Sequence, residues 1–174
     1  MAAYTSNFSS WSSIESLLSA AQAFESSTTY TAAKDSLTSL LGYLSTPAQT
    51  SSVVGNTATF SYPNGVTAYF SGYNFGTTSA VITNITLTNG SVTVTLGGSV
   101  SINTSTGAMA GAITSLSYSG FGYYESATGQ IPLDGTTAVM TSWSSTVPTS
   151  LGNVTFSATG TASVSGGTTT YVFS

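Results

Sequence analysis

The sequence predicts an α+β fold that is mainly β, with two N-terminal helices packed on an antiparallel β-sheet or sandwich. The hydrophobic period is three to four residues before Pro47 and two residues from Ser52 onward. Glycine-containing pairs separate the later segments, as turns do between strands. A chain of 174 residues suits one domain with a substantial core. We therefore expect a single domain over residues 1–174, with a helical segment at 1–47 and a β-rich region at 52–174; a β-solenoid is the alternative.

The first predicted helix lies within residues 9–26. Ser12 and Glu15 have the spacing of a capping box, in which each side chain bonds a backbone N–H at the start of a helix. The apolar residues that recur at helical spacing are Trp11, Ile14, Leu17, Leu18, Ala21 and Phe24. This pattern predicts a helix with one face packed on the core.

The second predicted helix covers residues 31–44. Gly42 weakens its last turn, and Pro47 prevents it from continuing. Its apolar residues share one face, which we expect to pack on the core: Ala33, Leu37, Leu40, Leu41 and Leu44.

Alternation of β-forming and small polar residues predicts the strands of the β-rich region. They lie at residues 57–62, 66–72, 80–90, 91–98, 99–105, 112–120, 138–143, 154–160, 162–167 and 168–174. Asn89-Gly90 predicts a hairpin with a type I′ turn. The apolar residues expected to face each other across this hairpin are Ile82, Ile85, Leu87, Val92, Val94 and Leu96. Residues 126–133 have the character of a loop.

The charge composition excludes several partners. Charged residues are only 3% of the chain, with one lysine, no arginine and a net charge of −4. One cation cannot neutralise a phosphate backbone, so no nucleic-acid partner is expected. No apolar run approaches the length of a membrane span, so no membrane insertion is expected. Serine and threonine hydroxyls take the place of charges as the surface chemistry.

The residue types that enzymes need are largely missing. Without histidine or cysteine, no Ser-His-Asp triad, histidine metal site or thiolate site can form. Lys34 and Thr31 have the spacing of a hydroxyl–lysine dyad, but the adjacent Asp35 favours a solvated lysine. Glu125 and Asp134 are the two acids of the β-rich region, and they are weak candidates for a carboxylate pair or a Ca²⁺ site. We expect a protein without catalytic activity and without a cofactor.

Tyrosine and phenylalanine are the remaining candidates for a binding surface. Tyr118, Phe121, Tyr123 and Tyr124 cluster around two glycines, and Tyr69 and Tyr73 lie in a second aromatic segment. Such rings suit sugar stacking or a protein–protein contact, or else form cross-strand pairs that only stabilise the sheet. The threonines at 86–88 and 93–95 alternate in a way that projects ranks of hydroxyls, which is compatible with ice binding.

Residues 96–120, "LGGSVSINTSTGAMAGAITSLSYSG", and the tail "TTTYVFS" at 168–174 resemble bacterial proteins exported by the one-step, type I pathway. The resemblance covers residues 52–174 and implies an extracellular or cell-surface protein with an uncleaved C-terminal signal and no cleaved N-terminal one. Such proteins include surface-layer, matrix, adhesin and haemophore proteins. In the haemophore case Tyr73 would stand at the haem-ligating position, but the histidine that this family usually adds is missing.

The scarcity of charged residues suggests how the protein functions, because few of them are available to protect the edges of a sheet. Soluble monomers normally protect the edges of their sheets with lysine, proline or bulges. A neutral Ser/Thr/Gly surface without this protection predicts a structural protein whose subunits assemble into a filament, matrix or surface lattice. The alternatives are a monomeric adhesin or glycan-binding module that uses Tyr118, Tyr123 and Tyr124, a phage or virion structural protein, a haemophore-like protein and an ice-binding protein.

Overall fold

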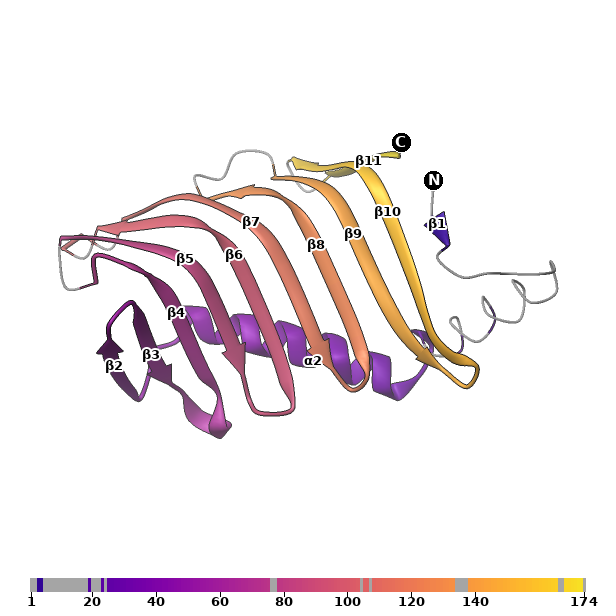
Figure 1. Cartoon of the computed structure of the whole chain (residues 1–174), viewed down its shortest axis with the longest axis horizontal. Coiled ribbons are helices and arrows are strands. Elements are labelled where there is room, and N and C mark those ends of the chain that lie inside the picture. The colour runs from indigo at the N-terminus through magenta and orange to yellow at the C-terminus, as the bar shows by residue number, and fades with distance from the viewer. Residues whose placement is uncertain are drawn as a thin grey trace.

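One long antiparallel sheet with a helix lying across one of its faces makes up the fold (Figure 1). The computed structural model describes residues 3–4, 19, 23, 25–75, 78–103, 105–106, 108–133, 138–165 and 168–173. The mainly β architecture and the antiparallel sheet predicted from the sequence are confirmed.

The sheet is a meander in which neighbours in sequence are neighbours in space. Its strands are β2 (Thr50–Val54), β3 (Thr57–Ser61), β4 (Thr67–Tyr73), β5 (Ser79–Thr88), β6 (Val92–Asn103), β7 (Met109–Gly120), β8 (Tyr123–Pro132), β9 (Ala138–Thr149) and β10 (Gly152–Ser165). Strand β2 forms one edge. At the other edge β10 pairs with two short strands, β1 (Ala3–Tyr4) and β11 (Thr168–Phe173).

Helix α2 (Thr28–Gly42) is the second predicted helix. Ser27 caps it by accepting a hydrogen bond of 3.2 Å from the Tyr30 N–H, and a 3₁₀ turn (Tyr43–Ser45) follows it. Ala33 and Leu40 are buried, and the helix packs against β5 and β6. Leu44 was expected on this apolar face but lies in the 3₁₀ turn and is exposed, because the helix ends before it.

The first predicted helix, within residues 9–26, lies mostly outside the described residues. Ser19, Ala23 and Glu25 are described and are helical. The capping pair Ser12 and Glu15 is not among the described residues.

The core lies between α2 and the sheet. Along β5 and β6, apolar side chains at alternate positions point toward the helix and are buried, whereas the residues between them point to the opposite face. The apolar residues predicted to face each other across the β5–β6 hairpin are all buried here: Ile82, Ile85, Leu87, Val92, Val94 and Leu96.

The sandwich and the solenoid are both wrong. The described strands form one open sheet, with α2 rather than a second sheet against its inner face. Each strand from β2 to β10 pairs antiparallel with the next along the chain, whereas a solenoid stacks successive coils. The hydrophobic alternation alone was compatible with all three arrangements, because each needs strands with one apolar face.

Several predicted strand ends are also wrong. Residues 91–98 and 99–105 were expected to be two strands but belong mostly to β6, and the loop expected at 126–133 is largely part of β8. The glycines there do not turn the chain back. They lie in or beside β-bulges, where one strand carries an extra residue and bends.

The bulges line up across the sheet and divide each long strand into two halves. We call this line the crease. The register shifts that define it lie at Ser71/Gly72, Ile82/Asn84, Gly97/Gly98, Ile113/Ser115, Thr128/Gly129 and Thr159/Ala162. Gly98 and Gly129 lie where a Cβ atom would meet a backbone carbonyl of the neighbouring strand, of Ala112 and of Val139 respectively. Only glycine permits this approach.

The predicted β5–β6 hairpin is present, but its turn is not type I′. Gly90 has a φ of +90°, whereas Asn89 is not among the residues with positive φ. The Asn89 side chain instead accepts hydrogen bonds from the N–H groups of Ser91 (3.1 Å) and Val92 (2.9 Å). This side-chain bonding holds Asn89 in an ordinary conformation, so only the glycine supplies the left-handed residue.

Candidate functional site

Two of the candidate tyrosines, Tyr118 and Tyr123, belong to the core. They are 1% and 4% exposed, and their ring centroids lie 5.9 Å apart. Tyr30 of α2 packs edge-on against Tyr123 at 5.4 Å, so this cluster fastens the helix to the sheet. The predicted binding surface made of Tyr118, Tyr123 and Tyr124 therefore does not exist as such, because two of its three rings are inaccessible to a ligand. The alternation of Leu116 and Tyr118 with serines is the sequence signal that places Tyr118 inside.

Hydrogen bonds position the Tyr123 hydroxyl. It donates to Glu125 Oε2 at 3.0 Å and accepts from the Ser145 hydroxyl at 3.3 Å. Burial raises the pKa of Tyr123 well above its ordinary value, with a smaller upward contribution from the nearby Glu125 carboxylate. Burial also raises the pKa of Tyr62 and that of Tyr118. These three phenols are therefore held neutral in the fold.

Stability is expected to fall at alkaline pH. Above about pH 10 the tyrosines of the unfolded chain release protons while the buried ones keep theirs, so the unfolded state binds fewer protons and the free energy of unfolding decreases. Urea unfolding measured between pH 8 and pH 11 checks this. Tyr123→Phe removes one of the three groups and should make the decline shallower; a free energy that stays constant over this range would contradict the prediction.

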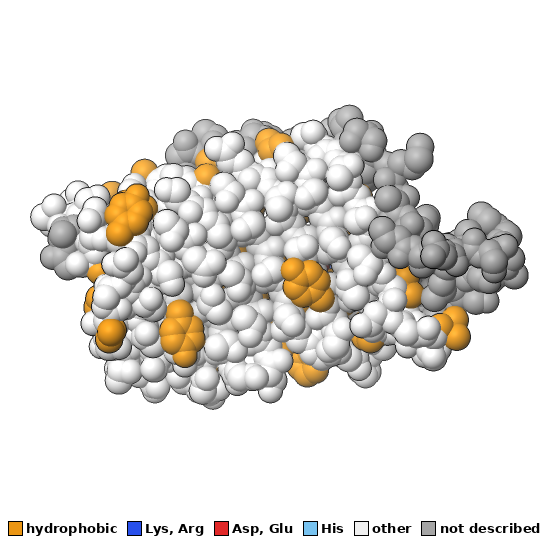
Figure 2. Space-filling model, in the orientation of Figure 1, with side chains coloured by type: hydrophobic (Ala, Val, Ile, Leu, Met, Phe, Trp, Pro, Cys, Tyr) orange, Lys and Arg blue, Asp and Glu red, His pale blue; other side chains and the backbone are white. Residues whose placement is uncertain are grey.

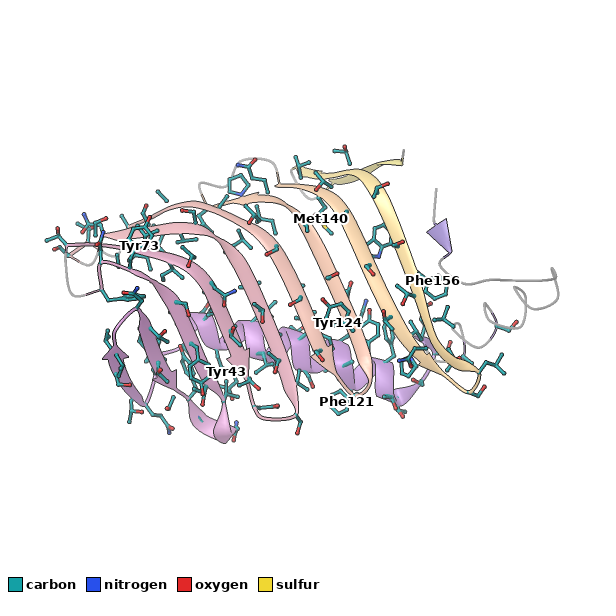
Figure 3. The ribbon with its side chains drawn as sticks, in the orientation of Figure 1. Tyr43, Tyr73, Phe121, Tyr124, Met140 and Phe156 are labelled. Atoms are coloured by element: carbon teal, nitrogen blue, oxygen red, sulfur yellow. The ribbon has the colours of Figure 1, made fainter. Side chains whose placement is uncertain are left out.

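The remaining aromatic candidates lie at the surface. Tyr69 and Tyr124 are 41% and 43% exposed, and Phe121 and Tyr73 are also exposed. Phe121 lies in the β7–β8 turn, and Tyr73 lies near the end of β4, away from Tyr124 (Figure 3). The structure therefore does not gather the aromatic candidates into one cluster: two are buried, and four are spread over the surface.

The sheet face opposite α2 carries ranks of hydroxyls, which we call the hydroxyl face. Strand pairing places its residues in three rows between β2 and β10. The first row is Thr50, Ser61, Thr67, Thr88, Thr93, Ser119, Tyr124, Thr146 and Thr155; the second is Ser52, Thr59, Tyr69, Thr86, Thr95, Ser117, Ser126, Ser144 and Ser157; the third is Val54, Thr57, Ser71, Asn84, Gly97, Ser115, Thr128, Ser142 and Thr159. Every residue of the first two rows carries a hydroxyl. The threonines at 86–88 and 93–95 were the sequence signal for this face.

The hydroxyl face is open to solvent and uncharged. None of its side chains is buried. In Figure 2, which looks onto this side of the sheet, hydrophobic side chains of the described residues appear as isolated spots, and no charged one is visible. Neighbouring hydroxyls bond to one another along the rows, as in Thr146–Thr155 at 2.9 Å and Thr88–Thr93 at 3.2 Å. The face thus presents orderly donors and acceptors to a neutral partner.

The described residues that the sequence offered for catalysis or metal binding are not arranged as a catalytic dyad or a metal site. The Lys34 amine lies over the ring of Tyr30, 5.2 Å from its centroid, and the Thr31 hydroxyl donates a hydrogen bond to the Ser27 carbonyl. The hydroxyl and the amine are therefore not paired as a catalytic dyad requires. Asp134, the proposed partner of Glu125, lies outside the described residues. Among the described residues no group of three or more His, Cys, Asp or Glu is placed to hold a metal ion. No helix in this part of the chain combines the length and apolarity needed to cross a bilayer.

Strand β2 leaves one edge of the sheet open. It pairs with β3, and no described strand pairs with its other side. All five of its residues, Thr50–Val54, are exposed, and none is charged or proline. Residues Thr168–Phe173 of the tail considered above as an export signal form β11 at the opposite edge, where β11 is bonded to β10.

Comparison with protein-family models, with curated proteins and with solved structures finds no match for this chain.

Proposed function

We propose that this protein is a structural subunit without catalytic activity, which assembles with copies of itself by adding strands at the β2 edge. The exposed, uncharged edge of β2 carries the proposal. Alternate residues of an edge strand direct their N–H and C=O groups outward, where a further strand can bond to them. Val53 and Val54, 58% and 78% exposed, add apolar surface beside those groups.

The expected strength of this contact favours assembly only at high concentration. Pairing along the five residues of β2 makes about five hydrogen bonds, each contributing about 0.5–1.5 kcal/mol. Association costs about 4–15 kcal/mol in lost translational and rotational freedom. A single contact is therefore weak, and further burial of Val53 and Val54 must contribute to it. Joining the β2 edge to the opposite edge of the next copy, where β1 and β11 pair with β10, would extend the sheet without limit, because such a head-to-tail contact does not close.

A location outside the cell is part of the proposal. The low lysine content, the absence of cysteine and the resemblance to type I-secreted proteins support it. The direct measurement is the appearance of the intact chain in the medium of producing cells. A virion subunit would use the same edge, and capsid or tail genes beside the coding gene would favour that alternative over exporter genes.

Val53→Lys is expected to abolish assembly. A lysine on the edge strand would have to be buried or crowded when another strand pairs there. Natural proteins use lysines in this way to prevent further strands from pairing with an edge. Light scattering and electron microscopy over a range of concentrations should show ordered polymers for the unaltered chain and monomers for the variant.

Ser117→Lys is the matched control, because it adds the same charge at the centre of the hydroxyl face. It should leave assembly unchanged if the edge makes the contact. An unaltered chain that stays monomeric at high concentration would contradict self-assembly. Assembly that survives Val53→Lys but is lost in Ser117→Lys would indicate that the subunits contact each other through the hydroxyl face and not through the β2 edge.

A further inference from the structure

We propose that the hydroxyl face also binds an extended, neutral polysaccharide, with Tyr69 and Tyr124 stacking on its sugar rings. This site is separate from the β2 edge and does not depend on assembly. It replaces the glycan surface expected around Tyr118 and Tyr123, which are buried.

The two tyrosines stand out from everything around them on this face. Tyr69 lies between Thr59 and Thr86 in its row, so the adjacent side chains on both sides are small. Tyr124 likewise lies between Ser119 and Thr146. Each ring therefore lies among short hydroxylic side chains, and Tyr69 and Tyr124 remain 41% and 43% exposed. The rings contribute little to the core, and they are the accessible aromatic surfaces within the rows.

The placement of the rings suits a long ligand. Tyr69 is on β4 and Tyr124 is on β8, so four strand intervals separate them. At about 4.8 Å per interval this is roughly 19 Å across the face. The hydroxyls of β5, β6 and β7 fill the space between them, including those of Thr86, Thr95 and Ser117. A chain of several sugar units can contact both rings and bond to the hydroxyls between them.

The chemistry of the face selects a neutral ligand. The three rows contain no charged residue, so nothing there compensates a carboxylate, sulfate or amine on a polymer. Hydroxyl groups donate and accept hydrogen bonds, as sugar hydroxyls do, and tyrosine pairs an apolar ring with a polar tip. Binding should consequently change little with salt concentration.

The tyrosines also decide between a polysaccharide and ice. A flat array of threonine hydroxyls alone would be compatible with either surface. Two exposed aromatic rings standing among short side chains disturb the flat contact that a crystal lattice requires, whereas they provide the stacking platforms that sugar rings use.

The test is retention of the full chain by suspended cellulose and chitin at concentrations below those at which it assembles. We expect binding by the unaltered chain and a loss of about tenfold or more in affinity for the double variant Tyr69→Ala/Tyr124→Ala. Phe121→Ala is the matched control, since it removes an equally exposed ring from the β7–β8 turn, and it should bind as the unaltered chain does. Circular dichroism melting of all variants verifies that the exposed substitutions leave the fold intact.

Thr95→Val tests the hydroxyls separately, because it keeps a β-branched side chain and removes only the hydroxyl. It should weaken binding by a few-fold with an unchanged melting temperature. The proposal is overturned if neither polysaccharide is retained, if the double variant binds as well as the unaltered chain, or if anionic polysaccharides bind better than neutral ones. It is also overturned if the face arrests ice growth without retaining a polysaccharide. Because Val53→Lys should bind polysaccharide normally, failure of this site and failure of edge assembly are distinguishable.

Discussion

Leu87→Ala is expected to lower the free energy of unfolding by about 2–5 kcal/mol. Leu87 has no exposed surface and lies near the C-terminal end of β5, between Ala68 of β4 and Val94 of β6. A sheet with one helix against it has a thin core, so few side chains are available to fill the space that the substitution leaves. Chemical denaturation followed by circular dichroism measures the change.

Thr86→Ala, one residue earlier, is the control for Leu87. Its side chain lies on the hydroxyl face, so the change should cost less than about 1 kcal/mol, mainly through lower β-propensity. Equal losses for the two variants would contradict the assignment of one buried and one solvated face.

Gly98→Ala is expected to lower the free energy of unfolding by about 1–3 kcal/mol. The added Cβ would meet the Ala112 carbonyl and lie 2.9 Å from the Ile113 Cα. These are backbone atoms of the paired strand, which cannot move aside as the end of a flexible side chain can. The bulge must therefore open, and the hydrogen bonds between β6 and β7 near the crease weaken.

The same substitution at Gly42 should act in the opposite direction. Gly42 lies at the end of α2 with helical dihedral angles, and a Cβ there meets nothing within 4 Å. Alanine lowers the conformational entropy of the unfolded chain, so Gly42→Ala should raise the free energy of unfolding by up to about 1 kcal/mol. Urea denaturation of the two variants gives the comparison. Stabilisation in both would show that the crease does not require a glycine at position 98.

The hydroxyl face explains how a surface almost without charges remains polar. The stretch from Gly90 to Gly120 contains no charged residue, and it supplies all of β6 and β7. Val92, Val94 and Tyr118 of this stretch belong to the core beneath α2, while Thr93, Thr95 and Ser117 lie on the opposite face. Hydroxyls therefore hydrate the free subunit, and they leave a surface on which a neutral partner meets no electrostatic barrier.

The sequence by itself determined the local features of this protein. The helical period of Ala33, Leu37 and Leu40 located α2, and the alternation around Leu87 and Val94 predicted the hairpin and its buried rows. Both patterns reflect interactions between residues close in the chain, where the repeat of the helix or strand dictates which side chains share a face. The scarcity of charged residues was likewise the basis for expecting no nucleic-acid partner.

Only the tertiary structure decided what those faces become. Glycine pairs at turns and at bulges read alike in a sequence, and the close approach of Gly98 to Ala112 becomes visible only when β6 lies beside β7. The rows of the hydroxyl face, and the isolation of Tyr69 and Tyr124 within it, depend on the register between strands. Register is set by contacts between residues distant in the chain, and a shift of one residue would reverse every side chain of a strand. For the same reason the pattern could not distinguish an open sheet from a sandwich, because both need one apolar face per strand.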